Sequence, residues 1–192
     1  MRSTGSRAAA SLNQVVGGER DGRRAQLVEA AFRRVAESGF EGLRLRQVAE
    51  DVGIDHSTLH YHFATKQALV EAVAAHTTRQ FWETSPPAPD PATRLRVHLR
   101  TLQQMIVERP ELFAVTVELD LRARRDPAVA AAMAEHESGW RAKLVEILTD
   151  LVPDPDTSAE LVIAAVKGVR LLPDVAGPVL DRLAEQLTGE RG

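Results

Sequence analysis

Hydrophobic residues recur every three or four positions along most of this chain, which is the spacing of one face of an α-helix. The same stretches lack the strict alternation of apolar and polar residues that is typical of a β-strand. Glycines, prolines and capping residues separate the helical stretches from one another. The pattern therefore predicts an all-α protein of about nine helices.

The boundaries of the helices follow from these separating residues. We expect the first helix from about Arg23 to Ser38, because Gly39 ends it. The fourth should begin at Thr65 and run to about Thr84. The later helices should begin at Asp90-Pro91, Pro110, Asp126-Pro127, the capping box Thr157–Glu160 and Gly177-Pro178, with ends near Val152 for the seventh and Leu187 for the last.

The two shortest predicted helices lie within residues 45–66 and are joined by a tight turn. In the first, Val48, Ala49 and Val52 share one helical face. Gly53 ends this helix, since glycine adopts backbone conformations that other residues avoid. The segment is therefore expected to form a helix-turn-helix.

The second short helix has different chemistry on its two sides. Asp55 can cap its N-terminus, and Leu59 and Phe63, four residues apart, form its apolar side. The other side carries groups that donate or accept hydrogen bonds: His56, Ser57, Thr58, His60 and Tyr61. A short helix with an apolar back and a polar front suits insertion into the major groove of DNA. The segment therefore predicts sequence-specific DNA binding.

The run from Arg23 to Val73 resembles the N-terminal domain of TetR-type transcriptional regulators, over about a quarter of the chain. Residue types and spacing agree at Gly39, Phe40, Arg46, Val48, Ala49, Gly53, Ile54, Thr58, Leu59, His62, Phe63, Thr65, Lys66 and Leu69. Two positions depart from the family pattern. The family usually has a threonine in place of Arg44 and a tyrosine in place of His60.

The resemblance implies a three-helix DNA-binding head followed by a larger helical body. We expect a flexible tail over residues 1–21, the helix-turn-helix domain over residues 22–66, and an effector-binding and dimerisation domain over residues 67–192. The residues expected to contact DNA are Arg46, His56, Ser57, Thr58, His60, Tyr61, His62 and Lys66. Lys66 should clamp a phosphate, because an ammonium there joins the free amides of a helix start. An ordinary solvated surface is the alternative for the other polar groups.

In the family, helices four to seven enclose a cavity for a small organic effector. The residues expected to line it here are Trp82, His98, Met105, Phe113, Val117, Met133, His136 and Trp140. Met and Trp suit an apolar pocket in which a few polar groups orient the ligand. The alternative is that each of these is an ordinary core residue, with the histidines near the surface.

The last two predicted helices hold more apolar residues than a terminal helix pair can bury alone. In the family, such a pair packs against its twofold mate as a four-helix bundle. The expected interface residues are Leu161, Val162, Ala165, Val166, Val169, Leu172, Leu180, Leu183 and Leu187. A homodimer would place two recognition helices about one DNA turn apart, so that they read a palindromic operator.

Charge is distributed unevenly along the chain. Residues 1–66 carry ten basic and eight acidic residues, a balance of +2, whereas the remainder carries 14 basic and 19 acidic residues, a balance of −5. The two parts account for the net charge of −3. A mildly basic N-terminal part on an acidic body suits a protein that presents one end to DNA.

Composition excludes several other classes of protein. The chain has no cysteine, so disulfides and thiol chemistry are excluded. Its longest apolar run, Leu161 to Val166, is far too short to span a bilayer. The start of the chain lacks the sustained apolar stretch of a secretion signal. We therefore expect a cytoplasmic protein that does not bind membranes.

No catalytic motif is present: the sequence has no Gly-x-Ser-x-Gly elbow, no Gly-rich phosphate loop and no helical Glu-x-x-His set. We expect no enzymatic activity and no cofactor. His56 and His60 have a spacing that can hold a metal ion, but no Cys or carboxylate is spaced nearby to complete the ligand set, so we expect no metal site.

The sequence thus predicts a dimeric repressor that leaves double-stranded operator DNA when a small, largely apolar organic effector binds. The alternative is a helical DNA-binding regulator without a small effector, which responds to a protein partner.

Overall fold

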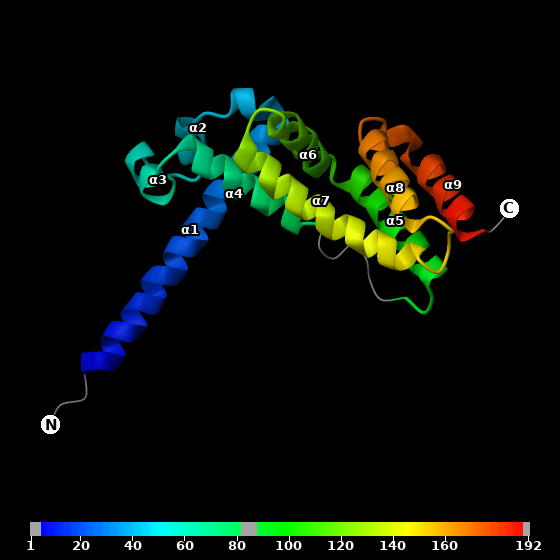
Figure 1. Ribbon diagram of the computed structural model, residues 1–192. Helices are drawn as coiled ribbons and strands as arrows, with labels where there is room; N and C mark the ends of the chain where they lie inside the picture. The colour runs from blue at the N-terminus through cyan, green and yellow to red at the C-terminus, as the bar shows by residue number, and fades with distance from the viewer. Residues whose placement is uncertain (1–4, 82–87, 190–192) are drawn as a thin grey trace. The chain divides into compact units, whose positions relative to one another are not determined.

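The computed structural model describes the backbone of residues 5–81 and 88–189, and side chains from residue 21 onward within those ranges (Figure 1). Its elements are α1 (Gly5–Gly42), α2 (Leu45–Asp51), α3 (His56–His62), α4 (Lys66–Arg79), α5 (Pro91–Glu108), α6 (Pro110–Ala123), α7 (Pro127–Leu148), α8 (Pro155–Val169), the short 3-10 helix η1 (Pro173–Val175) and α9 (Ala176–Thr188). The prediction of an all-α protein of about nine helices is confirmed over these described ranges.

Two predicted helix starts were wrong. Helix α1 begins at Gly5 and not near Arg23, so its backbone is already helical within the predicted tail, whose flexibility stays a prediction. Helix α8 begins at Pro155, because Asp154 caps it and accepts a hydrogen bond from the Thr157 amide at 3.1 Å. The predicted end of the fourth helix near Thr84 lies outside the described residues, and α4 itself ends at Arg79.

The predicted break at Gly39 is present as a kink inside α1. Gly39 has φ 65° and ψ 177°, which is not a helical conformation, and the helix then continues to Gly42. A positive φ of this kind favours glycine because it brings no Cβ into collision with the backbone. The sequence therefore located the break correctly, and a short helical segment follows it as far as Gly42.

The chain divides into two compact units, Met1–His76 and Thr77–Gly192, here called the head and the body. The head extends past the predicted boundary at residue 66, because the last residue of the head still packs on α1. The His76 Nε2 atom lies 3.2 Å from a carboxylate oxygen of Glu29, and its ring meets the edge of Phe32 with centroids 5.4 Å apart. Helix α4 therefore begins in the head and ends in the body.

The helix-turn-helix of the head consists of α2, the turn at Gly53 and α3. Gly53 has φ 71°, and its amide donates to the carbonyl of Glu50 at 3.0 Å. Ala49 and Leu59 are buried, so the apolar sides of both helices face the core of the head. This arrangement confirms the predicted turn and leaves the other side of α3 outside.

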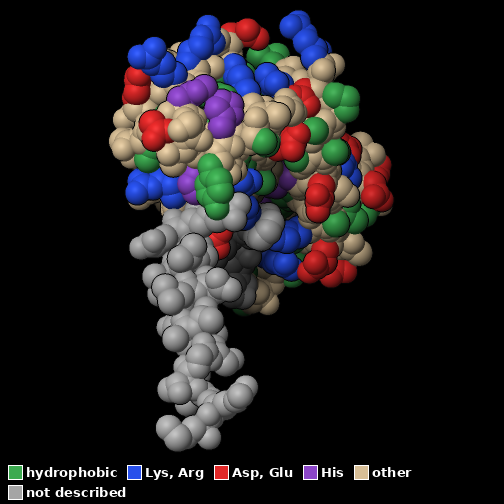
Figure 2. Space-filling model, turned by 90° about the vertical axis from the view of Figure 1, so that its left-hand side faces the viewer, with side chains coloured by type: hydrophobic (Ala, Val, Ile, Leu, Met, Phe, Trp, Pro, Cys, Tyr) green, Lys and Arg blue, Asp and Glu red, His purple; other side chains and the backbone are tan. Residues whose placement is uncertain are grey.

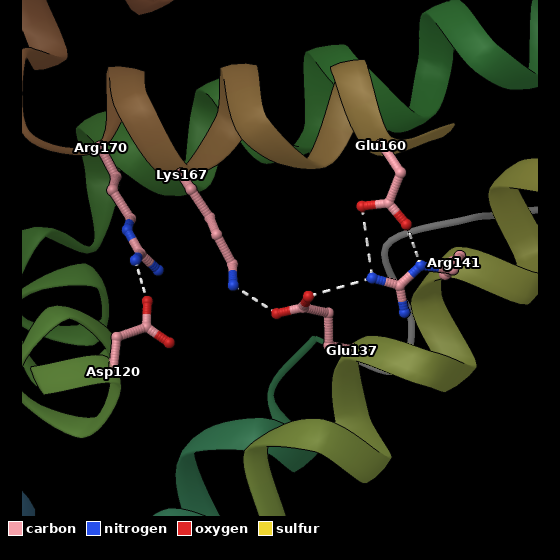
Figure 3. A network of polar contacts seen from close by, with 6 residues as sticks. All are labelled: Asp120, Glu137, Arg141, Glu160, Lys167 and Arg170. Carbon is pink, nitrogen blue, oxygen red and sulfur yellow. Dashed lines mark hydrogen bonds and ion pairs between the residues drawn. The ribbon is translucent and has the colours of Figure 1, made fainter. Parts of the chain in front are cut away.

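In the body, α7 packs against both α6 and α8, and α5 packs against α9. Charged side chains connect α6, α7 and α8 with the residue that follows α8 (Figure 3). Arg170 pairs with Asp120, Lys167 pairs with Glu137, and Arg141 pairs with both Glu137 and Glu160. Most of these groups are partly exposed, so each pair adds little stability alone. Together they restrict how α7 can slide along α8.

None of the helices in the described ranges is both long enough and apolar enough to cross a membrane.

Candidate functional site

The polar side of α3 lies on the surface of the head. Tyr61 is 66% exposed, whereas Leu59 and Phe63 on the opposite side are 0% and 1% exposed. His56, Ser57 and His60 are also exposed, and Thr58 and His62 are half-buried. Figure 2 faces the side of the molecule on which α3 lies and shows histidine and basic side chains at the surface. The structure therefore has the apolar back and polar front that the sequence predicts for this helix.

The outward rings of α3 are arranged in contacting pairs. The His56 and His60 rings meet edge to face with centroids 4.5 Å apart, and Tyr61 meets His62 in the same way at 5.4 Å. A neutral imidazole offers one donor and one acceptor, and a phenol offers both on one oxygen. Since α3 contains no Lys or Arg, its polar front presents hydrogen-bonding groups without fixed positive charge. Among the described residues, no set of three or more His, Asp or Glu is grouped to hold a metal ion.

Asp55 organises the start of α3, as its predicted role as a cap requires. Its carboxylate accepts hydrogen bonds from the Ser57 hydroxyl at 2.5 Å, from the Thr58 amide at 2.8 Å and from the Thr58 hydroxyl at 3.0 Å. These bonds, with that from Ser57 the largest cause, lower the pKa of Asp55 to about 2. The Ser57 and Thr58 hydroxyls thus both donate their hydrogens to the Asp55 carboxylate. For a DNA contact, Ser57 and Thr58 are left with oxygen lone pairs, which suit a base amino group better than a phosphate.

The two predicted basic contacts differ in how freely they can move. The side chain of Arg46 is 84% exposed and pairs with Glu50 one turn along α2, at 3.0 Å. Such an exposed pair is weak, so the guanidinium can leave it for a phosphate. Lys66 is half-buried at the first residue of α4, and its ammonium donates to the carbonyl of Phe40 at 3.4 Å. That bond holds the Lys66 side chain beside the helix start.

Arg44 occupies the cap position of α2 without capping it. No side-chain hydrogen bond from Arg44 satisfies the first amides of α2, and its guanidinium donates instead to the carbonyl of Glu41 at 2.5 Å. The threonine that the resembling family usually has at this position could cap the helix through its hydroxyl. The departure from the family pattern therefore leaves the start of α2 without a side-chain cap.

Sequence reasoning missed Arg24, which lies in α1 and contacts the end of α3. Its guanidinium donates to the carbonyl of His62 at 2.7 Å and lies 4.1 Å from the centroid of the Phe63 ring. The bonded residues are 38 positions apart. No local pattern could have indicated this contact, because helical periodicity reports neighbours within one or two turns only.

The residues predicted to line an effector pocket fall into two contacting groups in the body. His98 of α5 is buried, and its Nε2 atom accepts a hydrogen bond from the indole of Trp140 on α7 at 2.9 Å. Phe81 contacts both Phe113 of α6 and His136 of α7, each with ring centroids 5.6 Å apart. Phe81 was not among the predicted lining residues and joins this group.

The remaining residues that were predicted to line the pocket are Met105, Val117, Met133 and Trp82. Met105, Val117 and Met133 are half-buried, and Trp82 lies outside the described residues. Burial lowers the pKa of His136 below its ordinary value, so this imidazole is uncharged at neutral pH. A neutral imidazole beside aromatic rings can orient a ligand through one hydrogen bond without attracting charge.

Most of the predicted dimer residues are buried within a single chain. Val162, Val166, Val169, Leu180, Leu183 and Leu187 are buried, and Ala165 is half-buried. Leu161 and Leu172 are 55% and 63% exposed, and Leu171, Val175 and Val179 are exposed as well. Helical periodicity marked two apolar faces of α8 and α9 together, one that packs inward and one that stays uncovered. The five exposed residues lie in or between α8, η1 and α9.

Two family models match this chain. The model for bacterial regulatory proteins of the tetR family matches residues 27–73, and the model for the tetracyclin repressor-like C-terminal domain matches residues 89–189. The second alone covers more than half of the chain.

Among curated relatives, the HTH-type transcriptional regulator BetI of Burkholderia cenocepacia (strain HI2424) is 34% identical over 84 residues, which cover 41% of this chain and 43% of the relative. The chain thus spans about two fifths of the length of the curated relatives it matches.

Solved structures share the fold over most of the chain. A regulator from Saccharomonospora viridis in complex with choline has a TM-score of 0.72, 18% identity, and covers 88% of this chain and 95% of its own. AibR in complex with isovaleryl coenzyme A and operator DNA has a TM-score of 0.69, 20% identity, and covers 86% and 98% respectively. At these identities, the likeness concerns the fold alone.

Replacing Asp55 with Ala should lower the melting temperature of the head at pH 7 by about 2–8 °C, because the amide and hydroxyls at the start of α3 lose their acceptor. Asp55→Asn is the matched control and should retain most of the capping. Because the pKa of Asp55 falls from 3.8 to about 2 on folding, the charge-dependent part of this stabilisation is complete above about pH 4 and is lost as the pH falls toward 2. Circular dichroism melts at pH 7 and pH 2 measure both effects. Equal melting temperatures for the wild type and Asp55→Ala at pH 7 would contradict the capping role.

Proposed function

Since this chain belongs to the tetR family of bacterial regulatory proteins, we propose that it is a dimeric repressor released from its operator by a small organic effector. Membership of the family makes it a DNA-binding transcriptional regulator and not an enzyme. The dimer, the palindromic operator, the effector and the cytoplasmic location belong to the proposal.

The observation that carries the proposal is the exposed polar front of α3. Leu59 and Phe63 hold the back of the helix in the core, so His60 and Tyr61 are directed to solvent. In this role, the rings and hydroxyls of α3 meet base edges, and Arg46 and Lys66 meet phosphates. Phosphate contacts supply affinity and position, whereas contacts with base edges supply specificity.

The aromatic and histidine residues of the body support an effector site on α5, α6 and α7. Structures that share this fold hold choline or isovaleryl coenzyme A, which are organic molecules of different size and charge. In this chain, Phe81, Phe113 and the uncharged His136 form a cluster of three rings in which the imidazole is the only polar group. They favour a small, largely apolar ligand that carries a hydrogen-bonding group.

Helix α4 is the segment through which an effector can influence DNA binding. It runs from Lys66 in the head to Arg79 in the body, so the same helix carries a proposed phosphate contact and continues into the unit that holds the proposed ligand. Release requires only that the ligand favours one state of α4 over another. A coupling of about 1–3 kcal/mol changes operator affinity roughly 5- to 150-fold.

The exposed apolar residues of α8, η1 and α9 support the dimer. Leu161, Leu172 and Val179 belong to a surface that a single chain leaves uncovered. Water contact with several large apolar side chains is unfavourable, so a second copy that covers them gains about 25 cal/mol per Å² of buried area. The isologous packing of two copies of this surface would give the twofold symmetry that a palindromic operator requires.

Substituting His60 and Tyr61 together with Ala should weaken operator binding by roughly 5- to 150-fold, because each side chain lost from the front of α3 removes a base or phosphate contact. Fluorescence anisotropy with duplex DNA from upstream of the protein's own coding region measures the affinity. Both residues are exposed, so the melting temperature should stay close to that of the wild type. The control Arg124→Ala with Arg125→Ala removes two exposed charges from the body and should change affinity less than twofold. Retained affinity in the His60 and Tyr61 variant would refute the role of α3.

Effector binding should change the fluorescence of Trp140, which lies beside His98 in the proposed site. Trp82→Phe leaves Trp140 as the sole tryptophan, since the chain has two. Titration with small apolar ligands should give a saturable change in emission, and the same ligand concentrations should release the operator. If neither emission nor operator affinity changes across a broad ligand set, the small effector is ruled out and the regulator that responds to a protein partner is favoured.

Replacing Leu161 and Leu172 with Glu should convert the dimer into a monomer, because each charge would be buried against the second copy. Light scattering coupled to size-exclusion chromatography measures the mass in solution. Leu121→Glu is the matched control, since Leu121 is a similarly exposed leucine, 57%, on α6. A dimer that survives the double substitution, or a wild type that is monomeric, would disprove this interface.

A further inference from the structure

Recognition helix α3 is short, and its two ends are secured by different means. It contains seven residues, and Asp55 closes its N-terminal end from the adjoining position in the chain. A helix leaves its last carbonyls without partners inside the helix. At the C-terminal end, the partner of the His62 carbonyl comes from another helix, as the Arg24 guanidinium of α1 donates to it at 2.7 Å.

Arg24 makes two favourable contacts at the C-terminal end of α3. A guanidinium that donates to the end of a helix makes a charge-assisted hydrogen bond, and its charge is favoured by the negative end of the helix dipole. The same guanidinium lies 4.1 Å from the centroid of the Phe63 ring, within the range of a cation–π contact. The two contacts fall on consecutive residues, His62 and Phe63.

The Phe63 ring gives the Arg24 guanidinium a fixed surface on which to stack. Phe63 is the residue that ends α3, and it is only 1% exposed, so its ring is held by the core of the head. A planar guanidinium can stack on this ring while one of its N–H groups reaches the adjacent carbonyl. An ammonium can donate to the carbonyl but cannot stack in the same way.

Arg24 itself lies on the surface. Its removal would leave no cavity in the core, so the head should stay folded while the end of α3 loses its tie to α1. Arg24 also places a fixed positive charge at the C-terminal end of α3, which itself contains no Lys or Arg. The rival role for this side chain is therefore a direct contact with a DNA phosphate.

We propose that Arg24 is a positioning residue that fixes the orientation of α3 for DNA binding through the His62 carbonyl and the Phe63 ring. This inference rests on the proposed operator binding by α3. Arg24 restricts α3 to the orientation that fits the groove. Without it, a smaller fraction of molecules holds that orientation, and the observed affinity falls by that fraction.

The salt dependence of DNA binding separates positioning from a phosphate contact. The probe is a duplex selected from a random library by the wild-type protein, and dissociation constants are measured by anisotropy between 50 and 200 mM salt. Arg24→Ala should bind about fivefold to tenfold more weakly at every salt concentration, with the slope of log affinity against log salt unchanged. Arg24→Lys should recover part of the loss.

Two control variants define the other outcomes. Lys66→Ala, which removes a proposed phosphate contact, should reduce the salt slope by about 0.9. Arg23→Ala removes a charge next to Arg24, and the Arg23 guanidinium donates to the Gln26 side chain of the same helix at 3.0 Å. This variant should bind like the wild type. A reduced slope for Arg24→Ala, or an equal loss of affinity for Arg23→Ala, would overturn the positioning role.

Hydrogen exchange tests the same proposal without DNA. The Leu59 and Phe63 amides are bonded within α3, to the carbonyls of Asp55 and Leu59. In Arg24→Ala, their exchange should become about tenfold faster, while exchange in the buried part of α1 around residues 27–35 stays unchanged. Unchanged exchange in α3, or faster exchange throughout the head, would overturn the proposal. If the wild type selects no duplex, the proposed function fails, and the exchange result still decides whether Arg24 holds α3.

Discussion

The burial of Leu59 and Phe63 in the head is the constraint on which the candidate site depends. Side chains four residues apart lie on the same face of a helix, so two anchors determine which residues face outward. With Leu59 at 0% and Phe63 at 1% exposure, the outward residues of α3 are those that can form hydrogen bonds. Asp55 and Arg24 then add local restraints at the two ends of the helix. The surface proposed to meet DNA is thus defined by which side of α3 the core holds.

In the body, the apolar residues of the last helices also divide into a buried set and an exposed set. Helices α8 and α9 bury one face within the chain, whereas Leu161 on α8 and Leu172 in the turn before η1 are exposed. Charged pairs between α7 and α8, such as that of Arg141 with Glu160, join the effector region to the proposed dimer surface. The helix that carries His136 and Trp140 is therefore tied to the helix on which a second copy would pack.

The sequence was sufficient to locate most helices, because Gly, Pro and Asp act locally. Gly53 and Asp55 were identified correctly, since turn conformation and capping depend on adjacent residues. Interior and interface positions of α8 and α9 were not separable, because periodicity shows that a face is apolar but not what covers it. The hydrogen bond from the Ser57 hydroxyl to Asp55 was not predicted, because a pattern of exposed polar residues does not show which of them pair with one another. Arg24 was missed because its contact joins distant parts of the chain.

The absence of Lys and Arg from α3 has a consequence for how the protein searches a genome. Attraction to arbitrary DNA comes almost entirely from cationic side chains that displace counterions from phosphates. A helix without Lys or Arg, in the proposed reading role, adds little to that attraction but adds to binding wherever its hydrogen bonds find matching bases. The protein then stays on random DNA only briefly. It distinguishes its operator from other sites mainly by remaining bound there for longer. Such a regulator can inspect many sites in a short time and remain only where the bases fit.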